Sequence, residues 1–158
     1  MSRGADELRQ PAQLWALAVA QTTLALSQGQ FAEAPELIER AAAIGERVLA
    51  WGAAATRKMQ LFLLRREQGR LDAFVSEVSD HADEFPSPLV HRAILAQVYA
   101  RLERTEEARA LLHRPTRRDL SDWHVDEEWL FSICLLADTC AILGDAETAA
   151  PLYEVLLP

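Results

Sequence analysis

The feature that most constrains the fold is a short helix–turn–helix pattern that occurs four times along the chain. Its first copy is ALSQGQFAEA at residues 25–34, where one helix-forming run ends at Gly29 and another begins within two residues. Glycine lacks a Cβ, so it readily adopts the left-handed conformation that ends a helix. Similar sequences recur at residues 66–73, 101–108 and 142–149. The chain is therefore expected to be a series of helical hairpins.

Composition favours an all-α chain with one core and opposes two classes of partner. The 158 residues are 50% hydrophobic and 25% charged, which is enough for a single folded domain over residues 1–158. The formal net charge of −8 opposes binding to nucleic acid, because phosphates are neutralised by clustered Lys and Arg. The polar N-terminus predicts no signal peptide, and no apolar run approaches the roughly 18 residues of a membrane span. A cytoplasmic protein without membrane partners is expected.

Apolar periodicity predicts eight helices that pair into four hairpin repeats. The repeats are expected at approximately residues 11–49, 53–85, 89–113 and 126–158. The helices are expected at residues 11–28, 31–49, 53–68, 71–84, 89–102, 105–113, 126–143 and 146–157. On the first helix, the predicted buried stripe consists of Leu14, Leu17, Ala18, Gln21, Leu24 and Ala25. The segment 114–124 lacks helical periodicity and is predicted to be a surface loop.

The spacing of the four turns resembles a known repeat. The turn positions are Gly29, Gly69, Glu103 and Gly144, and each is followed five residues later by a small or apolar residue. This pattern resembles the tetratricopeptide repeat (TPR), a helix–turn–helix unit of about 34 residues. The third repeat matches the pattern best, through Leu95, Ala96, Tyr99 and Ala108. The chain departs from it where two of the three periods are near 40 residues and where Phe62 and Phe74 occupy positions that usually hold small residues.

Expanded repeats of this kind are similar to the helical-repeat region of large bacterial signalling ATPases and LuxR-type transcriptional regulators. That resemblance implies a right-handed superhelix of TPR-like hairpins that receives a signal through protein contacts, without catalysis. The apolar end at residues 152–157 suggests an uncapped solenoid face. We expect either a longer natural protein or a homodimer formed through this C-terminal end.

The residue types that carry chemistry are present but lack a specific arrangement. No glycine precedes a Lys-Ser or Lys-Thr pair, as a phosphate-binding P-loop requires. The carboxylates of residues 126–128 point in different directions on a helix, which favours a helix-dipole role over a metal site. Cys134 and Cys140 have no identifiable base partner among the four histidines. We therefore expect no enzyme activity, no cofactor and no metal.

The predicted binding surface is the concave face formed by the first helix of each hairpin, and its occupant is a peptide or a partner domain. The residues predicted to line this face are Met59, Leu63, Arg66, Gln97, Arg101, Phe131 and Asp138. Trp123 is added because loops on a rigid scaffold are often used for binding. Several of these side chains are about equally expected to fill the space between neighbouring helices. The alternative function is a sensing module that binds a small molecule between hairpins.

Overall fold

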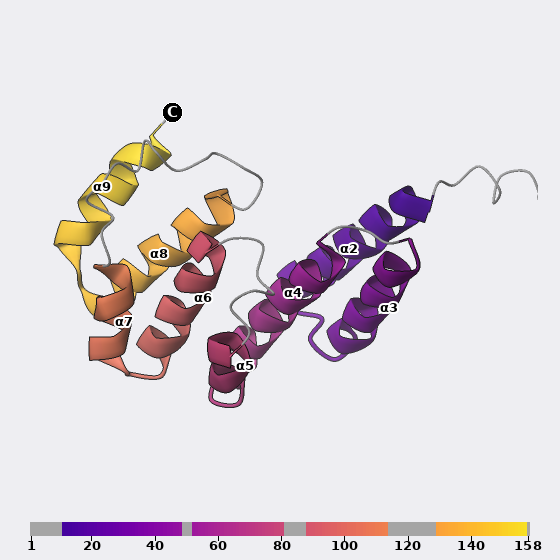
Figure 1. The fold of residues 1–158 in the computed structure, drawn as a ribbon, viewed down its shortest axis with the longest axis horizontal. Helices are drawn as coiled ribbons and strands as arrows, with labels where there is room; N and C mark the ends of the chain where they lie inside the picture. The colour runs from indigo at the N-terminus through magenta and orange to yellow at the C-terminus, as the bar shows by residue number, and fades with distance from the viewer. Residues whose placement is uncertain (1–10, 49–51, 81–87, 114–128, 158) are drawn as a thin grey trace, which may run out of the picture. The chain divides into compact units, whose positions relative to one another are not determined.

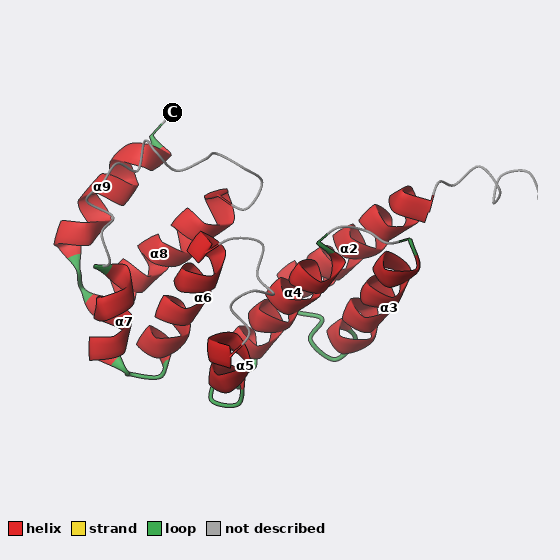
Figure 2. Ribbon diagram, viewed as in Figure 1, coloured by secondary structure: helices red, strands yellow, loops and turns green. Residues whose placement is uncertain are grey.

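The part of the chain that the computed structural model describes is entirely helical. It covers residues 11–48, 52–80, 88–113 and 129–157, and contains eight helices and no strand within those ranges (Figures 1 and 2). The helices are α2 (Pro11–Ser27), α3 (Ala34–Arg47), α4 (Ala53–Glu67), α5 (Phe74–Asp80), α6 (Pro88–Arg101), α7 (Thr105–Leu112), α8 (Trp129–Leu143) and α9 (Ala146–Leu156). The all-α prediction is confirmed.

The chain divides into two compact units, Met1–Gly69 and Arg70–Pro158, here called unit 1 and unit 2. Unit 1 contains α2, α3 and α4, and unit 2 contains the other five helices. The predicted hairpin over residues 53–85 crosses this division. That hairpin, and the single domain over residues 1–158, stay predictions.

In unit 1, α2 packs against α3 and both helices contact α4. Ile38 and Leu64 are buried at the centre of this core with Leu26 and Ala34, and Phe31, Leu61 and Leu63 pack around them. At Gly45 on α3, residues of α2 and α4 both come close to the backbone. A Cβ added there would lie 2.6 Å from the Cβ of Ala53 and 2.8 Å from Nε1 of Trp15, so only glycine fits without displacement.

In unit 2, α6 is the central helix and contacts α5, α7 and α8, while α8 also contacts α7 and α9. Small and β-branched residues on α6 are fully buried, among them Ala93, Ile94 and Val98. At the start of α6, the His91 Nε2 lies 2.9 Å from the carbonyl oxygen of Val78 on α5, which ties these two helices together. In unit 2, consecutive helices therefore contact each other as the pairs α6–α7 and α8–α9, and α6 and α8 join the two pairs (Figure 1).

The four predicted turn positions share one backbone conformation. Gly29, Gly69 and Gly144 have φ values of 73°, 66° and 64°, and Glu103 has a φ of 59°. Glu103 is the one non-glycine residue with positive φ in the described ranges, and it adopts the conformation that glycine provides in the other three copies. All four positions thus have a left-handed backbone, as does Gly52 before α4, with a φ of 84°.

Three details of the predicted helices are wrong. Within α2, Leu17, Gln21 and Leu24 are exposed, and the buried positions are Ala18, Thr22, Ala25 and Leu26. The helix is apolar around most of its circumference, so periodicity alone did not identify its buried face. α3 begins at Ala34 rather than residue 31, because residues 31–33 form a turn in which the Glu33 N–H donates to the Gln30 carbonyl at 3.3 Å. α5 begins at Phe74 rather than residue 71, after a similar turn, and the predicted end of this helix lies outside the described residues.

Candidate functional site

Three of the predicted binding residues meet in unit 2, between α6 and α8. The Gln97 side-chain amide donates a hydrogen bond of 2.6 Å to the Asp138 Oδ2. The Arg101 Nη2 donates to the same oxygen at 3.0 Å. We call these three residues the α6–α8 polar cluster. These hydrogen bonds join three of the predicted site residues across two helices.

Helical geometry explains why the cluster forms. Gln97 and Arg101 are four residues apart on α6 and so lie on one face, and α8 packs beside that face. Gln97 is fully buried, whereas the side chains of Arg101 and Asp138 remain 38% and 44% exposed. A buried amide thus holds one oxygen of a half-exposed carboxylate, and a half-exposed guanidinium holds it from the solvent side.

The cluster leaves polar groups available for a partner. Within the described ranges, Asp138 Oδ2 accepts both bonds, while Oδ1 and the other N–H groups of Arg101 make no bond to a protein group. Exposed ion pairs contribute only about 0–1 kcal/mol to stability, so the cluster is a minor source of folding energy. Its main consequence is to fix one acceptor and several donors in a defined orientation at the surface.

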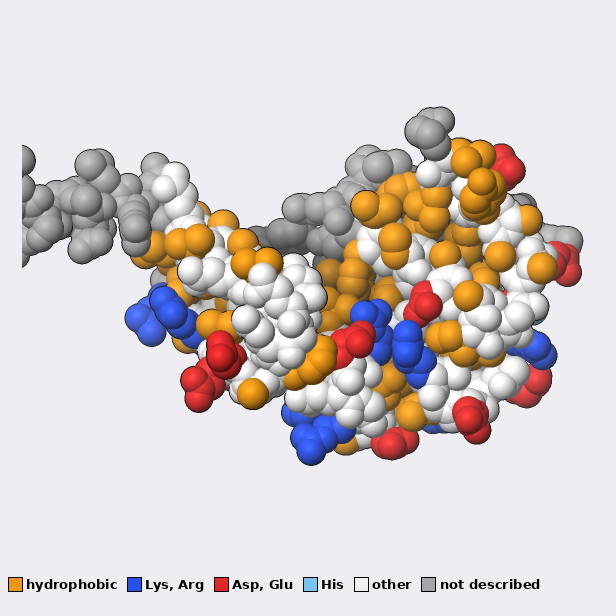
Figure 3. Space-filling view, turned by 180° about the vertical axis from the view of Figure 1, so that it is seen from behind, with side chains coloured by type: hydrophobic (Ala, Val, Ile, Leu, Met, Phe, Trp, Pro, Cys, Tyr) orange, Lys and Arg blue, Asp and Glu red, His pale blue; other side chains and the backbone are white. Residues whose placement is uncertain are grey.

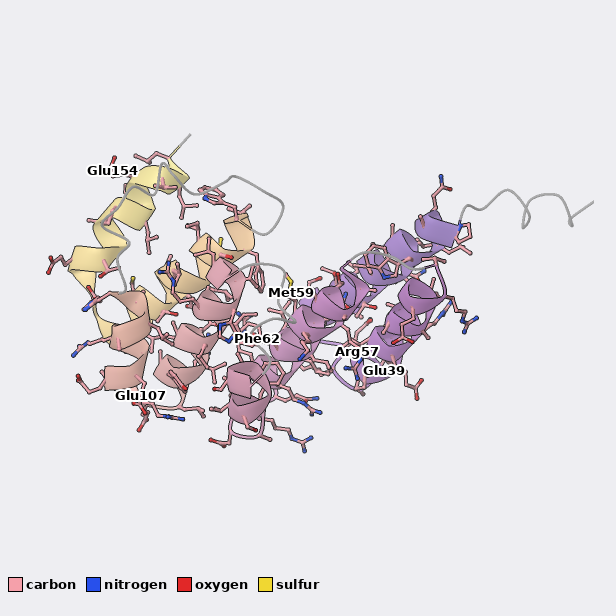
Figure 4. All side chains as sticks on the ribbon, viewed as in Figure 1. Glu39, Arg57, Met59, Phe62, Glu107 and Glu154 are labelled. Atoms are coloured by element: carbon pink, nitrogen blue, oxygen red, sulfur yellow. The ribbon has the colours of Figure 1, made fainter. Side chains whose placement is uncertain are left out.

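The other predicted binding residues have different environments. Leu63 packs against the unit 1 core and is thus, at least in part, a structural residue. Arg66 lies 5.8 Å from the ring centroid of Phe62 and 2.8 Å from Glu67 through its Nε. Met59 on α4 (labelled in Figure 4) and Phe131 on α8 are half-buried. Trp123, the predicted loop 114–124 and the carboxylates 126–128 lie outside the described residues.

A second polar contact, which the sequence analysis missed, connects α7 with the start of α9. Asp145 caps α9 by accepting a 3.0 Å hydrogen bond from the Thr148 N–H. Its other carboxylate oxygen lies 2.5 Å from the His113 Nε2, just after α7. The Thr148 N–H, followed by His113, lowers the pKa of Asp145 below its ordinary value. An Asp directly after the Gly144 turn and before a helical run was the available signal.

This cap predicts a dependence of stability on pH. Because the pKa of Asp145 is lower in the folded chain, its charge contributes stability that is present above the ordinary Asp pKa, near 4. That contribution is lost as the pH falls through the lowered value. Asp145→Ala should lower the free energy of unfolding at pH 7 by about 1 kcal/mol through loss of the cap.

Urea denaturation at pH 7 and at low pH measures both effects. Asp145→Asn is the matched control, because asparagine also caps helices but carries no charge. It should retain most of the stability at pH 7 and lose less than the wild type on acidification. Equal acid sensitivity of wild type and Asp145→Asn would contradict the assignment.

The two cysteine thiols differ in environment. Cys134 is exposed, whereas burial, followed by the charge of Asp145, raises the pKa of Cys140 to about 11. At neutral pH the Cys140 thiol stays protonated and is therefore a poor nucleophile. Within the described ranges, no group of three or more His, Cys, Asp or Glu side chains is arranged to hold a metal ion. None of the described helices combines the length and the apolar character needed to cross a membrane.

Comparison with known proteins found no matching family model, no matching curated protein and no matching solved structure.

Proposed function

We propose that this chain is a non-catalytic protein-interaction scaffold that binds a peptide or a partner domain on a concave helical face. In this proposal about four antiparallel hairpins form a right-handed, TPR-like superhelix. Two features support it: the four turn positions share a left-handed conformation, and in unit 2 the first helices of successive hairpins, α6 and α8, pack side by side. Repeats stacked in this way present extended surfaces for binding.

The observation that carries the proposal is the α6–α8 polar cluster. An extended peptide or the polar edge of an amphipathic helix offers both donors and acceptors. Asp138 provides a fixed acceptor and Arg101 provides fixed donors, and the 3.0 Å contact between Arg101 Nη2 and Asp138 Oδ2 holds the two side chains together. Because Gln97 holds the carboxylate from the buried side, less side-chain freedom is lost when a partner binds. Such preorganisation favours recognition of a polar main chain.

The proposed biological role is the signal-receiving or regulatory repeat region of a bacterial transcriptional regulator or signalling ATPase. This role rests on the resemblance of the repeat sequences, with their periods near 40 residues. The partner would then be a peptide segment or another domain in the same signalling system, in the cytoplasm. The acidic charge of −8 favours partners with net positive charge.

Selection from a library of random linear peptides tests the proposal. Peptides selected on the wild-type chain should lose about tenfold or more in affinity on Asp138→Asn and on Arg101→Gln, because each change removes a charge-assisted hydrogen bond. The matched control is the ion pair of Glu39 and Arg57 in unit 1, where Nη2 and Oε1 are 2.6 Å apart and the side chains have similar exposure (Figure 4). Glu39→Gln should leave the affinity unchanged.

Two outcomes would count against the proposal. One is that the wild-type chain selects no peptide, and the other is that the selected peptides bind equally to wild type and Asp138→Asn. If a metabolite screen instead raised the melting temperature with one saturating compound, the sensing alternative would replace the scaffold.

A further inference from the structure

Exposed, uncharged side chains run along α8 next to the α6–α8 polar cluster. Leu130 is 55% exposed, and Cys134 and Ala141 are exposed as well; we call these three residues the α8 stripe. Together with Asp138 they are separated by four, four and three positions, the spacing of one helix face. On the face of unit 2 that Figure 3 draws, hydrophobic side chains lie beside acidic and basic ones. Asp138 therefore lies between uncharged residues one turn before and one turn after it.

The polar cluster can still bind a group that both donates and accepts hydrogen bonds. Within the described ranges, Asp138 Oδ1 and the N–H groups of Arg101 that do not bond to Asp138 make no bond to a protein group. The two side chains carry opposite charges, so a partner carboxylate would be repelled by Asp138 and a partner ammonium group by Arg101. A neutral amide has both an acceptor and a donor and avoids both repulsions. Charge and hydrogen-bonding capacity thus favour an amide at this position.

An amide can come from an extended main chain or from a side-chain carboxamide, and the α8 stripe favours the second source. Positions 134, 138 and 141 span about 10.5 Å along the axis of α8. A second helix repeats the same three- and four-residue intervals, whereas three same-face positions of an extended peptide span about 13 Å. The small side chains of Cys134 and Ala141 let a second helix approach Asp138 closely. Because the main-chain amides of a helix bond to one another, a side chain of that helix must supply the amide.

We propose, on the basis of the scaffold function above, that the partner is an amphipathic helix that packs along α8 and places a glutamine or asparagine against Arg101 and Asp138. The carboxamide oxygen accepts from Arg101, and the carboxamide N–H donates to Asp138 Oδ1. Apolar residues one turn before and one turn after the carboxamide pack on the α8 stripe. The partner helix thus covers the exposed apolar side chains and satisfies the polar cluster between them.

Peptides selected on the wild-type chain should show this pattern. Each should carry a glutamine or asparagine with an apolar residue three or four positions away on both sides, and the carbon chemical shifts of the bound, labelled peptide should be helical. Replacement of the central carboxamide residue by glutamate, lysine or leucine should in each case weaken binding about tenfold, as measured by titration calorimetry. Glutamate and lysine are repelled by one member of the cluster, and leucine leaves both members without the partner's hydrogen bonds.

Variants of the chain assign these effects to the two parts of the surface. In Asp138→Ala, the preference for a central glutamine over leucine should shrink to about threefold or less, because one partner of the carboxamide is gone. Arg101→Met serves the same purpose if Asp138→Ala loses its helical circular dichroism. Leu130→Ser should weaken every selected peptide about fivefold through loss of apolar contact. The matched control is Leu24→Ser on α2, because Leu24 is 56% exposed and lies outside the α8 stripe, and it should change no affinity.

Failure of the helical partner is distinguishable from failure of the scaffold. If no peptide is selected, or if none responds to Asp138→Asn, the scaffold and the helical partner are both excluded. If the selected peptides respond to Asp138→Asn but bind in an extended form, the scaffold stands and the helical partner is excluded. The same conclusion follows if those peptides tolerate glutamate or lysine at the central position, or if Leu130→Ser and Leu24→Ser have equal effects.

Discussion

Replacement of Gly45 by valine is expected to lower the free energy of unfolding of unit 1 by about 2–3 kcal/mol. The reason is steric, because a Cβ at this position would lie 2.6 Å from the Ala53 Cβ and 2.8 Å from the Trp15 Nε1. Valine adds two methyl groups beyond the Cβ, at a position where even the Cβ does not fit. The three helices of unit 1 would have to move apart, with loss of contacts around Ile38 and Leu64.

Urea denaturation followed by circular dichroism measures this loss, and amide hydrogen exchange assigns it to unit 1. Ala54→Val on the exposed side of α4 is the matched control and should cost only the difference in helix propensity, roughly 0.5 kcal/mol. If Gly45→Val and Ala54→Val unfold at the same urea concentration, the close approach of α2, α3 and α4 is not as described.

The second large effect is expected for Gln97→Glu. The introduced carboxyl group would be buried beside Asp138, where the half-exposed Arg101 already pairs with that carboxylate. Burial and the neighbouring carboxylate both raise its pKa in the folded state, by about 2 pH units or more. A shift of that size lowers the free energy of unfolding by about 3 kcal/mol once the pH is above the raised value.

Because the pKa of the introduced carboxyl group is raised in the folded state, the stability of the variant depends on pH. Below the pKa of an unfolded Glu, near 4.3, the introduced group is protonated in both states and can donate to Asp138 as the Gln97 amide does. The variant should then be nearly as stable as the wild type. As the pH rises, its stability should fall increasingly below that of the wild type until the raised pKa is passed. Gln97→Met, which cannot ionise, should show a deficit that the pH does not change, and a similarly constant deficit for Gln97→Glu would contradict the buried position.

Local features of the fold were predictable because single residues determine them. Gly29, Gly69 and Gly144 end helices by adopting positive φ, and spacing alone identified Glu103 as the fourth turn position. Pro35 lies in the first turn of α3, where its missing N–H is harmless. The starts of α3 and α5 were predicted three residues early, because the apolar pattern continues through the turns that precede them.

Features that depend on which helices meet were harder to predict. The outward face of α2 could not be chosen, because its apolar residues surround the helix and only packing against α3 and α4 leaves Leu17 and Leu24 outside. Gly45 was missed since nothing in its local sequence distinguishes it from a tolerated helical glycine. The cluster of Gln97, Arg101 and Asp138 was partly anticipated, since repeat register placed all three on one surface. Its hydrogen bonds depend on the distance between α6 and α8.

The most direct test of the scaffold proposal maps where a selected peptide binds. Backbone amide chemical shifts of the labelled chain are recorded as one peptide, selected on the wild type, is added to saturation. The largest changes should occur on α6 and α8 around Arg101 and Asp138, and they should disappear for Asp138→Asn at the same peptide concentration. Changes confined to unit 1 or to α9, or changes that persist in Asp138→Asn, would contradict binding at the α6–α8 polar cluster.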